Sequence, residues 1–493
     1  MAVADISSGF LDASTWSGRV YVNGWNRGGG GDYSVVEPAT GSELGRIGLA
    51  TAADVASAAE SAAKAQRDWA KTGYQDRAAI IRKAADLWKA HGDDIHPWIM
   101  RETGAILPKA QLETWFAAST CYDSAALTSL PYGELLQTRD PILSFSRRLP
   151  LGVVGVISPF NFPLILSIRA VAPALALGNA VLLKPDPRTA VSGGVTLARI
   201  FEEAGLPAGL FHVLPGGADV GEALVTDPNV SMISFTGSSR AGRIVGALGA
   251  HHLKKVHLEL GGKNVLIILD DVDVEKAASV GAWGSYLHQG QICMTTGRHL
   301  VHRDIADKYI QALSEHANHL PVGDPMSGTV ALGPIIDARQ RDNVHRIVTE
   351  SVAGGARLAA GGTFDGLYYR PTVLAEVTKH SPAYVEEIFG PVAPVIAFDS
   401  IDEAVAMASD NEYGLSVGIL TTNVMRGLEI ADRIPSGIVH INDQTIGDEV
   451  TNPFGGVKSS GPGARIGGMQ ANIDAFTQVQ WVTMRGDLPQ YPF

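Results

Sequence analysis

Cysteine is scarce in this chain of 493 residues, which contains only Cys121 and Cys293. Two thiols in a chain of this length exclude a disulfide framework of the kind that holds small secreted domains together. The first ten residues also lack a basic segment followed by an apolar run, so they do not resemble a signal peptide. We therefore expect a reduced, cytoplasmic protein.

Long apolar runs and concentrated positive charge are missing as well. The most apolar region, 151–183, is interrupted by prolines, asparagines and an arginine, whereas a membrane span needs about 20 mostly apolar residues. The chain has 39 basic and 51 acidic residues, a formal net charge of −12, and no stripe of lysine or arginine. Because nucleic acids are bound by neutralising their phosphates, we expect neither a membrane nor a nucleic acid as partner.

Several common catalytic signatures are absent too. The sequence contains no GxGxxG after a strand, no GxxxxGK[ST], no HExxH and no GxSxG. Its 14 histidines show no spacing typical of metal ligands, so we assign no metal. The ordinary dinucleotide fingerprint and three large enzyme classes therefore lack support.

What the sequence does contain, from residue 150 onward, is an alternation of buried strands with helices. Such alternation is typical of a parallel, doubly wound sheet, and it occurs twice, so we predict an α/β fold with two such units in series. Two amphipathic helices are expected before it, at 51–70 and 76–91. The later elements that we expect are strands at 151–157, 180–184, 211–214, 232–235, 264–269, 297–302, 394–398, 417–421 and 437–441, and helices at 163–177, 192–204, 216–226, 240–248, 274–289 and 306–319.

The C-terminal segment 476–484, FTQVQWVTM, alternates like an edge strand. A terminal edge strand often pairs with another subunit, so we expect an oligomer. A strand that completes its own sheet remains the alternative.

Cys293 is the first candidate for chemistry. It lies in HQGQICMTTGRH, between an expected helix and an expected strand, among small and polar residues. A structural cysteine usually sits in an apolar stretch, as Cys121 does, so the setting of Cys293 favours a nucleophile.

Glu259 and Asn161 are the next candidates. Glu259 in HLELGGKN lies between two leucines at a strand end, where it is either a solvent-facing residue or a general base in a partly apolar pocket. Asn161 in SPFNFP lies in a loop between two prolines. Its amide either donates to an oxyanion or bonds its own loop backbone.

Two further features suggest contacts to a nucleotide. Lys184 ends the strand AVLLK, where it is either a solvated strand end or a partner for a ribose hydroxyl. Gly237 and Ser238 in SFTGSS lie where a strand meets a helix, and helix N-termini bind phosphate.

Taken together, these segments resemble the aldehyde dehydrogenase superfamily. SPFNFP, LLKP, FTGSS, LELGGKN, GQICM, EEIFGPV and NPFGG occur in the family's order over nearly the whole chain, and Glu259 and Cys293 lie 34 residues apart, as the family requires. The resemblance implies an aldehyde dehydrogenase-like fold. It consists of a dinucleotide-binding domain (1–126 and 150–259), a catalytic domain (260–460) and a small β extension for oligomerisation (127–149 and 461–493), in a homodimer or homotetramer.

The resemblance also implies roles for individual residues. Cys293 corresponds to the nucleophile, Glu259 to the general base and Asn161 to the side-chain oxyanion donor, with the backbone N–H of Cys293 as second donor. Acylating relatives that pass the acyl group to coenzyme A generally lack this glutamate, so its presence favours hydrolysis to the free acid. The implied cofactor-binding residues are Lys184, Gly237, Ser238, Glu387, Phe389, Ile157, Pro159, Phe160 and Leu260.

The substrate is predicted to be an aromatic aldehyde. HQGQICM, KPDPRT and GPGARIGG resemble the benzaldehyde and vanillin dehydrogenase branch of the superfamily, and aromatic side chains near the thiol suit a flat ring. For Trp283 and Tyr286, ordinary core packing is the alternative. The substrate-binding residues that we predict are Phe162, Arg169, Trp283, Tyr286, Ile292 and Phe454.

Arg169 leaves a second substrate class open. It either meets a polar ring substituent or a substrate carboxylate, or forms a structural ion pair; a carboxylate would indicate a semialdehyde acid such as succinic semialdehyde. A non-catalytic member of the family is a further alternative, but such proteins usually lose the nucleophile or the base, and this chain retains both.

The cofactor is predicted to be NAD, with appreciable use of NADP. Strictly NAD-using members of the family often carry a glutamate three residues after the strand-end lysine, where it repels a 2′-phosphate. Here that position is Pro187, next to Asp186 and Arg188. Asp186 is a candidate substitute for the missing charge, and Arg188 a candidate phosphate contact.

Overall fold

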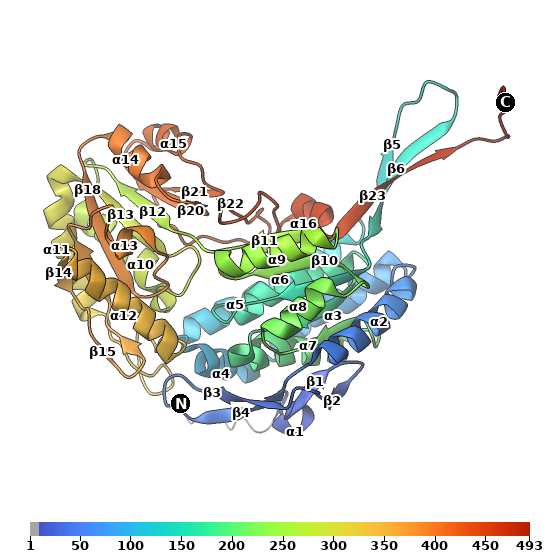
Figure 1. The fold of residues 1–493 in the computed structure, drawn as a ribbon, viewed down its shortest axis with the longest axis horizontal. Coiled ribbons are helices and arrows are strands. Elements are labelled where there is room, and N and C mark those ends of the chain that lie inside the picture. The colour runs from blue at the N-terminus through green and yellow to red at the C-terminus, as the bar shows by residue number, and fades with distance from the viewer. Residues whose placement is uncertain (1–8) are drawn as a thin grey trace.

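The computed structural model describes residues 9–493 and builds them around two seven-stranded sheets (Figure 1). The expectation that no signal segment is present falls largely on residues 1–8, outside the described residues. The predicted α/β fold with parallel-sheet units is confirmed. Within the described part of the chain, no helix has both the length and the apolar character needed to cross a membrane.

The first sheet has the strand order β11-β10-β7-β8-β9-β1-β2. Strands β7 to β11 run parallel, whereas β1 and β2 are antiparallel at one edge. Every residue of β7 and β8 is buried, because helices cover both faces of the sheet. The strands are β1 (Arg19–Tyr21), β2 (Trp25–Arg27), β7 (Val153–Ile157), β8 (Ala180–Lys184), β9 (Phe211–Val213), β10 (Val230–Thr236) and β11 (Lys255–Glu259).

The helices of this unit begin close to the predicted positions. Thr51 and Asp54 form a capping box that fixes the start of α2, since each side chain accepts from the other's backbone N–H. The helices are α2 (Ala52–Trp69), α3 (Tyr74–Ala90), α4 (Gly92–Thr103), α5 (Leu107–Leu127), α6 (Pro163–Ala176), α7 (Thr196–Ala204), α8 (Ala218–Thr226) and α9 (Ser239–His251), after a short α1 (Ala13–Trp16) and the hairpin of β3 (Asp32–Val36) and β4 (Glu43–Gly48).

One predicted helix start is wrong. The helix expected from residue 192 begins as a π-helical turn at Val191–Val195, and regular α-helix starts at Thr196. Glycine is a poor helix former, and Gly193 packs so closely that an added Cβ would lie 2.9 Å from Pro163. The close approach of the two segments therefore outweighs regular helical geometry here.

The second sheet has the strand order β14-β17-β18-β13-β12-β20-β21, parallel except for β14 at the edge. Its strands are β12 (Asn264–Ile268), β13 (Thr296–His302), β14 (Arg357–Ala360), β17 (Thr372–Ala375), β18 (Val392–Phe398), β20 (Ser416–Leu420) and β21 (Ile438–Ile441). Its helices are α10 (Val274–Tyr286), α11 (Arg303–His319), α12 (Ala338–Ala353), α13 (Pro382–Val385), α14 (Ile401–Ser409) and α15 (Val424–Ala431). Two further antiparallel pairs are the hairpin of β15 (Phe364–Asp365) and β16 (Tyr368–Tyr369) and the long-range pair of β19 (Tyr413–Gly414) and β22 (Val457–Lys458).

The helix expected at 274–289 is also shorter than predicted. Helix α10 ends at Tyr286, and His288 and Gln289 have φ angles of 47° and 55°. Left-handed backbone cannot continue a right-handed helix. The chain therefore turns sharply before Cys293, which follows in a loop and not on the helix.

A three-stranded arm projects from the body of the molecule (Figure 1). Its strands are β5 (Gly133–Leu135), β6 (Leu143–Pro150) and β23 (Thr477–Met484), which follows α16 (Met469–Phe476). Strand β23 pairs with β6 along its whole length, from Thr477 opposite Pro150 to Met484 opposite Leu143. The C-terminal strand thus completes a sheet of its own chain, as one of the two interpretations of its sequence expected. The predicted domain boundaries stay a prediction.

Candidate active site

The first sheet brings several predicted residues to one edge. Ile157 pairs with Lys184 on one side and with Phe235 on the other, and Thr236 pairs with Glu259. These residues end four parallel strands, and ligands of open α/β sheets bind outside the carboxyl ends of the strands. Ile157, Lys184 and Glu259 therefore line one edge of the sheet, next to the loop 158–162 that carries Asn161.

The second sheet presents its opposite ends to the same place. Cys293 precedes β13, Glu387 precedes β18, and Asn264 begins β12. The Nδ2 of Asn264 donates to the carbonyl oxygens of Cys293 at 2.8 Å and of Thr295 at 2.9 Å. Asn264 was not predicted as a site residue, although it belongs to the LELGGKN segment. It fixes the backbone on which the thiol is carried.

Asn161 reaches across to the thiol segment. Its side chain is buried, and its Nδ2 donates to the carbonyl oxygen of Gln291 at 2.9 Å, two residues before Cys293. This contact spans the two sheets, so Asn161 does not bond its own loop, which was the alternative. An amide group has two N–H bonds, and the second remains for an oxygen bound beside Cys293.

A buried ion pair beneath this loop was missed by the sequence analysis. Lys109 of α5 donates through Nζ to the carbonyl oxygen of Asn161 at 2.8 Å and pairs with Glu113 one helical turn away. Glu113 in turn accepts from the backbone N–H groups of Leu164 and Ile165, at 3.0 and 3.2 Å, where α6 begins. A lysine and a glutamate at i,i+4 spacing usually form a pair on the surface of a helix. The sequence therefore contains no sign that Lys109 and Glu113 are buried and hold the loop.

Glu259 faces the interior, which excludes the solvent-facing alternative. Its side chain is buried, and burial raises the pKa of its carboxyl group above the ordinary value, partly offset by His257 and Arg169. His257 Nε2 lies 3.2 Å from Glu259 Oε1, within ion-pair range but without hydrogen-bond geometry. Within residues 9–493 neither carboxylate oxygen has a hydrogen-bond partner. A proton acceptor with this setting matches general-base chemistry.

The Cys293 thiol lies in an environment that opposes its ionisation. Burial, the largest cause, and the carboxylates of Glu387 and Glu259 together raise the pKa of the thiol to about 12, while Arg169 acts in the opposite sense. Because the thiolate is the nucleophilic form, the thiol must lose its proton during attack on a substrate. The nearby carboxylates are the groups that can receive it.

The residues predicted to bind the cofactor form a close-packed cradle. A Cβ added to Gly261 would lie 2.2 Å from the Glu387 carboxylate, and one added to Gly237 would lie 2.7 Å from the Phe235 ring. Ser238 caps α9, accepting from the N–H of Ala241 at 3.3 Å. Glycines at close approaches and a capped helix N-terminus suit a pyrophosphate, so these residues fit a dinucleotide.

Glu387 and the aromatic pair beside it continue the cradle. Glu387 accepts from the N–H of Gly262 at 3.1 Å, and burial raises the pKa of its carboxyl group to about 7. Phe389 has a φ of 52° and packs edge to face on Phe160, with 5.9 Å between ring centroids. Leu260 is buried against α9 at Gly242. Pro159 lies in the loop between Ile157 and Phe160.

Arg188 is already paired with two carboxylates. Its guanidinium contacts Asp186 at 2.7 Å and Asp337 at 2.5 Å, and it stacks over Phe160 at 4.4 Å. These carboxylates raise the pKa of Arg188 against the effect of its burial. Lys184 is buried nearby. A cavity of about 760 Å³ opens beside Arg188 and is lined by Phe160, Arg188, Asp337, Arg339, Gln340 and Asn343.

Part of the predicted substrate pocket gathers around the thiol. Ile292 and Phe454 are buried in one apolar cluster that Phe162 and Cys293 join. Arg169 lies over the Phe454 ring at 4.4 Å and pairs with Asp448. The structure thus brings four of the predicted substrate residues to one wall, beside Cys293.

Tyr286 does not join this pocket, which corrects the prediction for this residue, whereas the role of Trp283 stays a prediction. Tyr286 is buried in a different core cluster and donates its hydroxyl to the carbonyl oxygen of Thr372 at 3.2 Å. Trp283 is 58% exposed. Helix α10 thus turns Tyr286 to the core and Trp283 to the surface. For Tyr286 the structure therefore supports the alternative, ordinary core packing.

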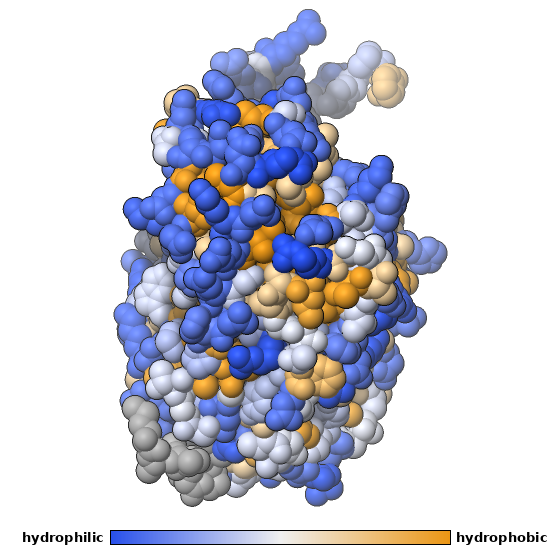
Figure 2. Space-filling model, turned by 90° about the vertical axis from the view of Figure 1, so that its left-hand side faces the viewer, coloured by the Kyte–Doolittle hydropathy of each residue, from blue (hydrophilic) through white to orange (hydrophobic). Residues whose placement is uncertain are grey.

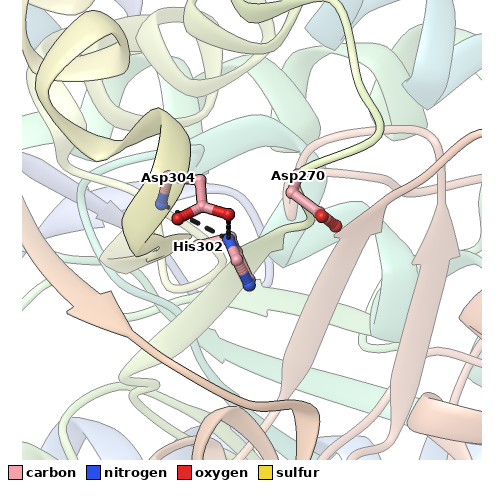
Figure 3. A group of neighbouring side chains, drawn as sticks. All are labelled: Asp270, His302 and Asp304. Carbon is pink, nitrogen blue, oxygen red and sulfur yellow. Dashed lines mark hydrogen bonds and ion pairs between the residues drawn. The ribbon is translucent and has the colours of Figure 1, made fainter.

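A separate acidic group lies away from these residues, at the end of β13 (Figure 3). Asp270, His302 and Asp304 bring ligand-type atoms within 4.8 Å of one another, and both aspartates are exposed. His302 accepts from the N–H of Asp304 and so caps α11. Helix capping therefore accounts for this arrangement.

Comparison with known proteins shows the family to which the chain belongs. A model described as the aldehyde dehydrogenase family matches residues 25–482. The chain is similar to a vanillin dehydrogenase of Amycolatopsis, with 61% identity over 98% of this chain and 100% of the relative. It is also similar to a benzaldehyde dehydrogenase [NAD(+)] of Pseudomonas putida, with 49% identity over 97% of this chain and 98% of the relative.

Solved structures agree with these matches. A salicylaldehyde dehydrogenase of Pseudomonas putida, complexed with salicylaldehyde, superposes with a TM-score of 0.92 and 32% identity, covering 96% of this chain and 99% of that one. A betaine aldehyde dehydrogenase of Staphylococcus aureus in complex with NAD+ superposes with a TM-score of 0.94 and 28% identity, covering 99% and 98%. The likeness extends over the whole arrangement of two sheets and arm.

Proposed function

This chain belongs to the aldehyde dehydrogenase family, and we propose that it oxidises aromatic aldehydes of the benzaldehyde and vanillin type to carboxylic acids with NAD. The observation that carries the proposal is the convergence of Cys293, Glu259 and Asn161 at the facing ends of two sheets. A non-catalytic role fits this arrangement poorly. A buried carboxylate without a hydrogen bond among the described residues serves no evident structural purpose.

The chain's own residues supply the first step. The Cys293 thiol gives up its proton to a neighbouring carboxylate, that of Glu387 or Glu259, as its sulfur bonds to the aldehyde carbon, and the carbonyl oxygen becomes an oxyanion. The remaining N–H of the Asn161 amide and the backbone N–H of Cys293 are the donors for that oxygen. Donors fixed in place before the reaction are worth a few kcal/mol of transition-state stabilisation, roughly 10²–10³ in rate for one donor.

Glu259 acts after oxidation. Lys184, Glu387 and the glycine cradle would hold the nicotinamide cofactor, which would supply the acceptor for the hydride of the tetrahedral carbon. The product on the enzyme is then a thioester of Cys293. Glu259 takes a proton from water, the resulting hydroxide adds to the thioester carbon, and the carbon–sulfur bond breaks to release the acid and the thiolate.

The aromatic substrate class rests on the pocket and on the relatives. Phe162 and Phe454 face the thiol cluster and offer ring surfaces to a flat substrate. The relatives with 61% and 49% identity are named vanillin and benzaldehyde dehydrogenases. The semialdehyde alternative requires an arginine available to a substrate carboxylate, and Arg169 is already paired with Asp448.

Kinetics with a panel of aldehydes test this function. Reduced cofactor formed at 340 nm is measured with benzaldehyde, vanillin, a short aliphatic aldehyde and succinic semialdehyde. We expect kcat/KM for benzaldehyde or vanillin to exceed kcat/KM for the aliphatic aldehyde and for succinic semialdehyde at least tenfold, which corresponds to about 1.4 kcal/mol. A higher value for succinic semialdehyde contradicts the aromatic assignment, and no turnover of any aldehyde contradicts the proposed function.

The choice between NAD and NADP is proposed from the residues around Lys184. Pro187 leaves no repelling carboxylate at its position, but the partly buried Asp186 acts on Lys184, and Arg188 is neutralised by two carboxylates. We therefore propose NAD as the main cofactor with appreciable NADP use. Equal concentrations of the two cofactors test this, and zero turnover with NADP contradicts it.

The arm supports a homodimer or homotetramer, which we also propose. Strand β23 exposes three large apolar side chains, Val479, Trp481 and Met484, which are 62%, 67% and 55% exposed. Further apolar residues are exposed on α15, at Val424, Met425 and Leu428, and apolar side chains gather in the upper half of the face shown in Figure 2. Exposed apolar surface of this extent is typical of subunit interfaces. Light scattering tests the assembly, and a monomer contradicts it.

Two further expectations from the sequence stay proposals. A cytoplasmic location rests on the scarcity of cysteine, and the division into a cofactor domain, a catalytic domain and a bridging arm rests on the family resemblance. Fractionation of cells that express the full chain tests the first of these.

A further inference from the structure

The pocket beside the thiol contains a buried ion pair that the reaction itself does not require. Arg169 of α6 pairs with Asp448 in the loop after β21, and both groups are largely buried, with side chains 7% and 20% exposed. The guanidinium lies over the rings of Phe454, at 4.4 Å, and Phe116, at 5.4 Å. The pocket wall that contains Ile292, Phe162 and Phe454 thus also carries a guanidinium and a carboxylate.

The pair lies close enough to the thiol to act on its charge. Arg169 lowers and Asp448 raises the pKa of Cys293, and Arg169 also lowers the pKa of Glu259. The two contributions to the thiol have opposite signs. The pair therefore presents a strong local dipole to a substrate on Cys293 while adding no net charge to the pocket.

We propose that Asp448, held by Arg169, selects aromatic aldehydes that carry a hydroxyl group on the ring, by accepting a hydrogen bond from that hydroxyl. This inference rests on the proposed function and names the determinant of substrate class within it. A phenol donates one hydrogen bond, and a carboxylate acceptor makes that bond stronger than a neutral acceptor does. A site built to bond a substrate hydroxyl rejects the analogue that lacks it, because its own polar group is then left without a partner.

The same pair disfavours substrates with a carboxylate. A second anion placed at Arg169 lies next to Asp448, and like charges that are desolvated together repel strongly. The pair thus distinguishes a neutral hydroxylated ring from an aldehyde acid.

Matched substrates measure the preference. kcat/KM is compared for 4-hydroxybenzaldehyde and 4-methoxybenzaldehyde, and for the 3-substituted pair, because each methyl ether keeps the ring and its oxygen but loses the donor. We expect at least a tenfold preference for the hydroxyl compound in one of the two pairs. Equal values in both pairs contradict the inference.

Asp448→Asn tests the residue. The amide leaves Arg169 without a counter-ion, so we expect the hydroxyl preference to fall about tenfold and kcat/KM for 4-formylbenzoate, relative to benzaldehyde, to rise about tenfold. A general disturbance of the pocket lowers all values together and does not produce this gain. Asp402→Asn, at an exposed ion pair with Arg433, is the matched control and should change neither ratio.

A double variant covers the case in which Asp448→Asn does not fold. Arg169→Leu/Asp448→Leu removes both charges, and replacing a buried pair by apolar residues is often neutral for stability. It should lose the hydroxyl preference without gaining activity on 4-formylbenzoate. A retained preference in either variant overturns the inference, whereas no turnover of any aldehyde by the wild type overturns the proposed function instead.

Discussion

Two segments near the thiol, the loop 158–163 and the segment 259–263, both lie beside buried charged groups. The charged groups differ in whether they are hydrogen-bonded. Under the loop 158–163, Lys109 and Glu113 are buried, paired and hydrogen-bonded to the backbone. In the segment 259–263, Glu259 and Lys263 are equally buried, yet among residues 9–493 neither has a hydrogen-bond partner for its charged atoms. Both segments extend from strands of the first sheet.

This difference in hydrogen bonding distinguishes charged groups that support the structure from charged groups that are free to react. An ion pair with satisfied hydrogen bonds can be buried at tolerable cost, whereas a lone buried charge is expensive and shifts its pKa toward the neutral form. Burial accordingly raises the pKa of Glu259 and lowers the pKa of Lys263 to about 7. Groups with pKa values displaced in this way cluster at functional sites. The paired charges hold Asn161 in place, and Glu259, whose carboxylate oxygens have no hydrogen-bond partner among residues 9–493, is the group that we propose for proton transfer.

The largest expected effect comes from breaking the paired side. Lys109→Met leaves Glu113 as a buried carboxylate without a cation, so we expect the free energy of unfolding to fall by about 3–5 kcal/mol, measured by urea denaturation. Lys64→Met, at an exposed pair with Glu60 of the same i,i+4 spacing, is the control and should cost less than about 1 kcal/mol. Equal losses in the two variants contradict the comparison.

A second variant separates stability from positioning. Lys109→Met/Glu113→Gln removes both charges but keeps an acceptor for the N–H groups of Leu164 and Ile165. It should recover most of the lost stability, yet kcat/KM should remain about tenfold below wild type because the carbonyl of Asn161 has lost its lysine. Full recovery of activity shows that Lys109 does not position the loop.

Removing the Glu259 carboxylate should have the reverse effect. Glu259→Gln is expected to lower kcat by about 10²–10⁴ because water attack on the thioester loses its base, while a first-turnover burst of reduced cofactor persists. Stability should not fall. A raised carboxyl pKa in the folded state means that the group's contribution to stability is lost as pH rises above its unfolded value. Loss of the burst, or a stability loss of several kcal/mol, contradicts this assignment.

The pKa of the Cys293 thiol provides a further test of the charge on Glu259. Without cofactor, the rate of alkylation of Cys293 by iodoacetamide should rise with pH through the neutral and alkaline range, since burial raises its pKa to about 12. Glu259→Gln removes a neighbouring negative charge and should raise the rate at fixed pH about threefold to tenfold. Glu387→Gln should act in the same direction. A slower rate in Glu259→Gln shows instead that Glu259 deprotonates the resting thiol.

The smallest expected effect concerns Lys263. Its pKa is lowered to about 7 in the folded protein, so between this value and about 10.4, the ordinary pKa of lysine, the unfolded chain binds more protons and stability rises with pH. Lys263→Met should flatten that rise without lowering stability at neutral pH. Thermal unfolding between pH 7 and 10 measures it. An unchanged slope indicates that Lys263 stays charged in the folded state.

Much of the fold follows from local pattern. The run AVLLK predicts β8 with its observed bounds, Ala180–Lys184, because a strand covered on both faces reads as a continuous apolar segment. Boundaries failed where contacts between segments overrode propensity, at the π-helical turn beside Pro163 and at the left-handed residues after Tyr286. Both lie next to the site, where the local rules of a sequence most often give way to function.

The sequence by itself determined the family, the alternation of strands and helices, and the residue types at Cys293, Glu259 and Asn161, since motif order and hydrophobic period are properties of the chain alone. Only the tertiary structure decided which side chains share an environment. In the tertiary structure the Lys109–Glu113 pair is buried, Arg169 pairs with Asp448, and Tyr286 packs in a core cluster other than the one beside Cys293. Burial and charge pairing depend on residues far apart in the sequence, so no local pattern specifies them.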